Sequence, residues 1–248
     1  MKQSTVLEDF QDDIVVLTLN RPKQRNAFND QQYNDLSAAL ARAADSDRVH
    51  VVVITGAGGA FSAGQDINEM GSGSAFTPFV NQLMRFDKPL IAAVNGVAVG
   101  IGVTMLPHCD LVYVAAGARL RAPFAALGLV CEAGSSLLLP MVMGAQRAAD
   151  VLLSARWMTS SDAVALGLAA CAVPDHELMA TAMAKAREIA AQPLVVLRQI
   201  KWLLRAGYVD ALRAARERED ALQATRLGSP ENRAAIDAFQ RKRPRETP

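Results

Sequence analysis

The stretch LIAAVNGVAVGIG, residues 90–102, decides the fold class. Its first five residues are apolar and indicate a buried strand, and small residues follow before a helix start expected near Gly100 to Gly102. The earlier stretch ITGAGGAFSAGQD, residues 54–66, repeats this order. Backbone N–H groups of such loops can approach a ligand closely, and a helix start adds a positive dipole end. Side by side, the two loops would aim two donors at one oxygen and form an oxyanion hole.

Strands and helices alternate along the first two thirds of the chain. Short β-branched runs at 14–19 and 49–54 flank residues 30–45, which carry apolar side chains at helical spacing behind a possible cap at Asn29. The alternation continues with strands expected at 90–94 and 111–114 and helices expected at 146–154 and 162–168. The sequence therefore predicts an α/β fold.

Beyond about Pro174 the strand pattern stops. The remaining segments all favour helix, at residues 176–191, 193–206, 210–226 and 230–241. The second of them carries an apolar stripe of Leu197, Ile200 and Leu204, which indicates packing in the core or contact with another subunit, with contact to a cofactor as a more distant alternative. We expect this helical end to form a second subdomain.

Composition and charge argue against several classes of protein. Of the 248 residues 51% are hydrophobic, and 26 basic against 25 acidic side chains create no overall field for nucleic acid or an anionic membrane. Residues 89–109 lack charged side chains, but Asn95, several glycines and Pro107 divide them, so we expect no membrane span. Three widely separated cysteines and the absence of a signal-peptide pattern favour the cytoplasm.

The glycine-rich loop at 54–66 does not have the spacing of a nucleotide-binding motif. A dinucleotide fingerprint that began at Gly56 would need glycine where Phe61 stands, and a P-loop would need Lys-Ser or Lys-Thr where Gln65 and Asp66 stand. An ordinary tight loop remains an alternative to a ligand-binding one.

Several separated motifs resemble those of the crotonase superfamily, the enoyl-CoA hydratase/isomerase family. They are NRPKQRNAFN (20–29), FSAGQDINEM (61–70), AAVNGVAVGIG to CDLVYV (92–114), SSDAVALGLA (160–169) and AFQRKRP (238–244). The resemblance implies a crotonase-like spiral of ββα units over residues 1–190, which holds an acyl-CoA site, and a helical trimerisation region over 191–248. It also implies assembly as a homotrimer or as a hexamer, a dimer of trimers.

The same resemblance implies roles for individual residues. The N–H groups of Ala63 and Ile101 match the family's oxyanion donors, and Gly100 precedes the second of them. The residues expected to contact coenzyme A or the acyl group are Arg25, Ala27, Gln65, Asp66, Ile67, Gly100, Phe79 and Lys242. An aromatic such as Phe79 is equally well placed for ordinary core packing, and Asp66 for ordering its own loop.

The position of Glu132 points to the reaction. Family hydratases use two glutamates, but the matching positions hold Thr104 and Phe124, which cannot ionise usefully near neutral pH. The segment LGLVCEAGSS, residues 127–136, instead resembles the part of Δ3,Δ2-enoyl-CoA isomerases that carries their single catalytic glutamate, here Glu132. Its apolar flank would raise the carboxyl pKa toward a range that suits proton transfer. The alternative is a carboxylate that only stabilises the helix start near Ser135.

We therefore expect an isomerase that converts a 3-enoyl-CoA to a 2-enoyl-CoA by a 1,3-proton transfer. It would need no metal and no redox cofactor, because coenzyme A belongs to the substrate. Isomerisation of a ring-derived or dienoyl-CoA, weak hydration, and a catalytically silent acyl-CoA-binding protein remain alternatives. The neighbours His108, Cys109 and Asp110 suggest a nucleophilic site, but adjacent residues rarely face one another, so we expect them to pack in the core.

Overall fold

The computed structural model describes residues 4–69 and 74–242, and its centre is a six-stranded sheet. In spatial order the strands are β1 (Val6–Gln11), β2 (Ile14–Leu19), β3 (Val51–Gly56), β5 (Leu90–Val94), β7 (Leu111–Ala115) and β10 (Cys171–Val173). β1 pairs antiparallel with β2, and every other neighbouring pair is parallel. Buried parallel strands read as continuous apolar runs, which is why β2, β5 and β7 were predictable from sequence.

A second sheet is built from short strands. Their spatial order is β4 (Ala60–Ser62), β6 (Val97–Val99), β8 (Arg119–Arg121) and β9 (Trp157–Thr159). Because β4, β6 and β8 directly follow β3, β5 and β7, each turn of the chain places one strand in each sheet before it enters helical structure. The expected spiral of ββα units and the α/β class are confirmed.

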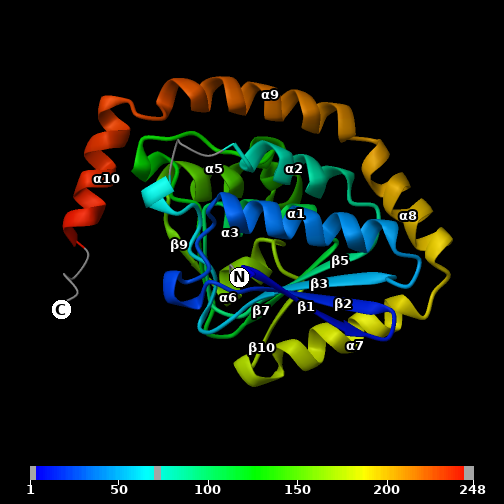
Figure 1. The fold of residues 1–248 in the computed structure, drawn as a ribbon. Coiled ribbons are helices and arrows are strands. Elements are labelled where there is room, and N and C mark those ends of the chain that lie inside the picture. The colour runs from blue at the N-terminus through cyan, green and yellow to red at the C-terminus, as the bar shows by residue number, and fades with distance from the viewer. Residues whose placement is uncertain (1–3, 70–73, 243–248) are drawn as a thin grey trace.

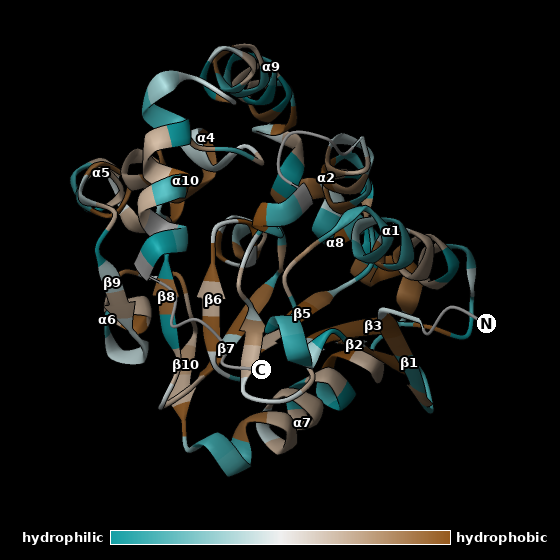
Figure 2. Cartoon of the chain, turned by 60° about the vertical axis from the view of Figure 1, so that its left-hand side comes forward, coloured by the Kyte–Doolittle hydropathy of each residue, from teal (hydrophilic) through white to brown (hydrophobic). Residues whose placement is uncertain are grey.

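Helices cover both faces of the large sheet (Figure 1). α1 (Asp30–Asp45) packs on β1 and β2, and α7 (Leu178–Ala190) packs on β3 and β5 from the other side. The predicted cap of α1 is confirmed, since the N–H of Gln32 donates to the Asn29 side chain at 3.0 Å. Figure 2 shows the hydrophobic strands enclosed between these helices.

Shorter helical segments connect the strands. They are η1 (Pro22–Gln24), η2 (Ile67–Glu69), α2 (Phe76–Arg85), α3 (Ile101–Thr104), η3 (Leu106–His108), η4 (Ala125–Leu127), α4 (Ser135–Met143), α5 (Ala145–Ser154), α6 (Ser160–Ala165) and η5 (Asp175–Glu177). The helix predicted at 162–168 is therefore shorter and begins earlier, because Thr159 caps it at residue 160 through a capping box with Asp162.

The last three helices form an arc around the core (Figure 1). They are α8 (Leu194–Ala206), α9 (Val209–Arg226) and α10 (Pro230–Lys242), close to the predicted ranges. α9 packs on α4, and α10 packs on η4. Among the helices of the described residues, none is both long and apolar enough to cross a membrane.

α8 turns its charged side toward the core and its apolar side outward. Lys201 is 4% exposed and donates to the Lys88 carbonyl at 2.5 Å and to Asp110 at 2.7 Å. Its neighbour Arg205 donates to the carbonyl of His108 at 2.6 Å. By contrast, Ile200 is 50% exposed and Leu204 is 70% exposed. The interpretation that the apolar stripe packs in the core of this chain is therefore wrong for Ile200 and Leu204.

Replacing Lys201 with Met should destabilise the fold by roughly 3 kcal/mol, because the buried Lys88 carbonyl and the Asp110 carboxylate would both lose a charged donor. Chemical unfolding of the variant measures this loss. Gln199→Met alters an exposed position on the same helix and is expected to stay within about 0.5 kcal/mol of the parent. Equal stabilities for the two variants would contradict the charged attachment of α8.

Candidate active site

Two glycine loops touch at the ends of β4 and β6. Gly64 has φ +91°, and a Cβ built on it would lie only 2.8 Å from the carbonyl oxygen of Val99. On the other side of the contact Gly100 also has a positive φ, +54°, although a Cβ built there would meet the Gly64 Cα at 3.8 Å, an ordinary van der Waals distance. At Gly64, only glycine combines a positive φ with so close an approach. Because of this contact, the residues that follow the two glycines, Gln65 and Ile101, lie near each other.

The hydrogen bonds of these loops decide which amides are free. The N–H of Ala63 donates to the carbonyl of Arg25 at 2.9 Å, so this amide already has an acceptor and the prediction of Ala63 as an oxyanion donor needs correction. Within the described part of the chain, the N–H of Gln65 has no hydrogen-bond acceptor. On either side of it, the Gly64 carbonyl accepts from the N–H of Phe28, and the N–H of Asp66 donates to the Phe28 carbonyl. Ile101 is the first residue of α3, where the N–H has no partner in its own helix.

The segment that precedes α1 holds the first loop in place. Asn26 is fully buried, and its side-chain amide donates to the carbonyls of Ala57 at 2.9 Å and Ala60 at 2.7 Å. Arg21 forms an ion pair with Asp66 at 3.0 Å. Asp66 therefore orders its own loop, which was one of the two roles expected for it.

The other predicted substrate contacts lie in varied surroundings. Arg25 is exposed, Ala27 is buried, and Gln65 and Ile67 are half-buried near the junction of the loops. Phe79 is fully buried in an aromatic cluster, with its ring 5.3 Å from that of Tyr33. The side chain of Lys242 lies outside the described residues. Contact of these residues with coenzyme A or the acyl group stays a prediction.

Glu132 lies in the loop that leads into α4 and is partly buried. Burial raises its pKa to about 8; the negative charges of Glu219 and Asp220 add to the increase, and Arg216 opposes it. The charge of Glu132 in turn adds to the effect of burial in raising the pKa of Tyr33. The Tyr33 hydroxyl also donates to the Gln65 side chain at 2.7 Å. Tyr33 therefore interacts both with Glu132 and with the loop that carries the free amide.

The two positions that match the glutamates of hydratases carry no acid. Thr104 is fully buried, and its hydroxyl lies 3.4 Å from the carbonyl of Gly100. Phe124 is 5% exposed. Neither residue provides a group that could exchange a proton with a substrate near neutral pH.

His108, Cys109 and Asp110 have separate partners and form no catalytic triad. The carbonyl of Ala133 accepts a hydrogen bond of 2.7 Å from Nε2 of His108. Burial lowers the pKa of His108 to about 4, so the ring is neutral and carries its proton on Nε2. The thiol of Cys109 donates to the Met105 carbonyl, with the sulfur 3.8 Å from the oxygen, and Asp110 pairs with Lys201.

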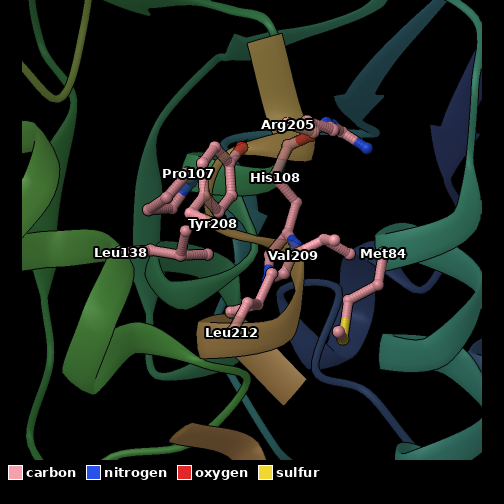
Figure 3. A pocket seen from close by; sticks show the side chains of 8 residues that line it. All are labelled: Met84, Pro107, His108, Leu138, Arg205, Tyr208, Val209 and Leu212. Atoms are coloured by element: carbon pink, nitrogen blue, oxygen red, sulfur yellow. The ribbon is translucent and has the colours of Figure 1, made fainter. Parts of the chain in front are cut away.

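A small cavity lies between η3, α4 and the start of α9 (Figure 3). Its lining comprises Met84, Pro107, His108, Leu138, Arg205, Tyr208, Val209 and Leu212. It includes neither the two loops nor Glu132, so it is separate from the predicted catalytic groups. Glu219, which the sequence patterns did not single out, contacts the same stretch of chain from α9.

Comparison with known proteins identifies the family of the chain. Residues 9–246 match the family described as enoyl-CoA hydratase/isomerase. A 1,2-epoxyphenylacetyl-CoA isomerase of Escherichia coli (strain K12) is 33% identical, and the match covers 96% of each chain. An enoyl-CoA delta isomerase 2 of Rattus norvegicus is 35% identical over 94% of this chain and 62% of its own length. Other relatives have names that describe hydratases.

A crystal structure of an enoyl-CoA hydratase/isomerase from Pseudoalteromonas atlantica T6c superposes with a TM-score of 0.93. It is 34% identical, and the superposition covers 97% of this chain and 98% of that one. The chain belongs to the enoyl-CoA hydratase/isomerase family, and its fold is that of the crotonase superfamily.

Replacing Gly64 with Ala should separate the two loops, because the added Cβ would meet the Val99 carbonyl at 2.8 Å and the backbone would be strained at φ +91°. We expect the activity toward an enoyl-CoA substrate to fall by ~10²-fold or more, since small displacements of an oxyanion hole are costly. Steady-state kinetics measures this. Gly59→Ala is the matched control, because a Cβ built there meets no atom within 4 Å. Full activity in Gly64→Ala would show that the contact of the loops is not needed.

Proposed function

We propose that the protein is an enoyl-CoA isomerase that moves a double bond from the 3-position to the 2-position of an acyl-CoA thioester. The observation that carries the proposal is the partly buried Glu132, whose pKa is raised to about 8. Its charge also raises the pKa of Tyr33, and the Tyr33 hydroxyl donates to the side chain of Gln65, the residue with the free amide. Membership of the family supports the broader class of reaction.

The proposed reaction needs one base. Glu132 removes a proton from C2 of the thioester, and the resulting dienolate carries negative charge on the thioester oxygen. The N–H groups of Gln65 and Ile101 stabilise that oxygen, and each donor contributes on the order of 10²–10³ in rate. Glu132 then returns the proton at C4. A carboxyl with a pKa near neutrality is suited to both transfers.

An isomerase is favoured over a hydratase because hydration would draw on a second positioned carboxylate, and Thr104 and Phe124 occupy the positions where family hydratases have their two glutamates.

A ring-derived acyl-CoA is the second candidate substrate, since the 33% identical relative from Escherichia coli is named as a 1,2-epoxyphenylacetyl-CoA isomerase. Side-by-side assays of 3-enoyl, 2-enoyl and ring-containing thioesters separate these reactions. The proposed enzyme needs neither a metal nor a redox cofactor.

Replacing Glu132 with Gln should lower the rate of isomerisation of a 3-enoyl-CoA by at least ~10²-fold, because the proton carrier is lost. In the parent, kcat/KM should rise about tenfold per pH unit below pH 8 and level off above it, because the base must be ionised and its pKa is raised to about 8. Proton NMR of the reaction measures both effects, and Glu177→Gln, at an exposed position, is the control.

Two results would contradict the assignment. Faster hydration of a 2-enoyl-CoA than isomerisation of a 3-enoyl-CoA would make the protein a hydratase. Thioester binding that survives in Glu132→Gln, together with no turnover of any enoyl-CoA by the parent, would make it a silent acyl-CoA-binding protein.

We also propose that the protein assembles as a homotrimer, or as a hexamer of two trimers, through the outward face of α8. The large apolar side chains exposed on this helix are Val195, Val196, Ile200, Trp202, Leu203 and Leu204, which are 42–70% exposed. Contiguous apolar surface of this kind is rare on monomers and common at subunit contacts.

We further propose that the protein is located in the cytoplasm, which its three unpaired cysteines support.

The double variant Trp202→Glu with Leu204→Glu should dissociate the assembly into monomers, because it places two charges in the apolar contact. Sedimentation velocity measures the mass of the particle. Leu153→Glu is the matched control, since Leu153 is 78% exposed on α5. A monomeric parent protein, or an unchanged mass in the double variant, would contradict assembly through α8.

A further inference from the structure

The backbone after Glu132 has an unusual conformation that distant contacts maintain. Ala133 has φ +60° and Gly134 has φ +76°, so two successive residues adopt the left-handed region directly beside the carboxylate. Left-handed backbone at a residue other than glycine costs on the order of 1 kcal/mol or more, and it persists only where its surroundings impose it. His108 holds this segment through the Ala133 carbonyl, and Glu219 holds it through the next amides.

Glu219 makes the most extensive of these contacts. It lies on α9, is 3% exposed, and uses both carboxylate oxygens. One oxygen accepts the N–H of Gly134 at 2.6 Å, and the other accepts the N–H of Ser136 at 2.7 Å. A carboxylate that bridges two amides at the start of a nine-residue helix fixes the direction in which that helix begins.

The packing of α9 leaves the segment little room to move. A Cβ built on Gly134 would lie 2.3 Å from a terminal carbon of Leu212, so the backbone here lies directly against α9. Gln223, one turn further along α9, accepts the N–H of Val130 at 3.1 Å. The loop that carries Glu132 is thus attached to α9 on both sides of the carboxylate.

The titratable and charged groups around this loop come from four elements. They are Tyr33 of α1, His108 of η3, Cys131 of the loop itself, and Arg216, Glu219 and Asp220 of α9. His108 is neutral, and burial raises the pKa of Cys131 to about 11, so neither carries charge near neutral pH. After burial, the charge of Glu219 is the largest contribution that raises the pKa of Glu132.

We propose that Glu219 is a positioning residue of the isomerase, which aims the Glu132 loop through two backbone hydrogen bonds and places a second negative charge beside the catalytic carboxylate. The inference rests on the proposed function. Glu219 does not itself exchange protons with the substrate, because amides of the chain occupy both of its oxygens.

Glu219→Gln tests both parts of this role. It removes the charge and one of the two acceptors, so we expect the pKa of Glu132 to fall by roughly one unit and kcat above that pKa to fall by ~10-fold or more. The pKa is measured without substrate, by 13C NMR titration of glutamate carboxyls, with Glu132→Gln to assign the signal. Glu217→Gln, on the exposed side of α9, is the control and should change neither quantity.

A second variant separates geometry from charge and guards against a failure of Glu219→Gln to fold. Glu219→Asp keeps the charge but is too short to reach both amides, so kcat should fall while the pKa of Glu132 stays within roughly 0.3 unit of the parent. A lower melting temperature without any change in pKa or kcat would reduce Glu219 to a structural residue and overturn the inference. If the pKa shifts but the parent shows no isomerase activity, the proposed function fails while the coupling of the two carboxylates stands.

Discussion

The direct backbone contact between Gly64 and Gly100 is the constraint on which the site depends. It exists because β4 and β6 pair in parallel, so the loops that follow them leave the sheet at the same edge. A side chain at Gly64 would meet the Val99 carbonyl and push the loops apart, and a side chain at Gly100 would be strained by its positive φ. The free amides of Gln65 and Ile101 follow the two glycines, and the parallel pairing of two three-residue strands therefore determines where the proposed oxyanion hole lies.

The second requirement, a carboxylate of raised pKa, is met by a different part of the chain. Glu132 interacts electrostatically with charged groups of α9 and with Tyr33 of α1. The arc of C-terminal helices is held to the core by charged groups, as Lys201 and Arg205 show, and this leaves the outward side of α8 apolar. The same helical region thus contributes charges near Glu132 and exposes the apolar surface through which we propose that the protein assembles.

Much of the fold could be predicted from the sequence because its long strands are continuous apolar runs and α1 has a helical pattern behind Asn29. The strands of the second sheet could not, because three residues are too few to show a period. The apolar stripe of α8 was visible, but a stripe does not say which side of a helix faces the core. Glu132 was identified by its charge beside apolar neighbours, whereas Glu219 was missed because it meets that loop only in the folded chain. Ala63 was mistaken for a free donor because its bond to Arg25 depends on backbone conformations that no pattern predicts.

The most direct test of the account is a crystal structure with a non-reactive acyl-CoA analogue bound. The account predicts that the thioester oxygen lies ~2.7–3.1 Å from the amide nitrogens of Gln65 and Ile101, with the Glu132 carboxylate within reach of both C2 and C4. A Glu132 side chain outside the acyl chamber, or another titratable group at C2, would contradict the isomerase mechanism and leave only the family and the fold.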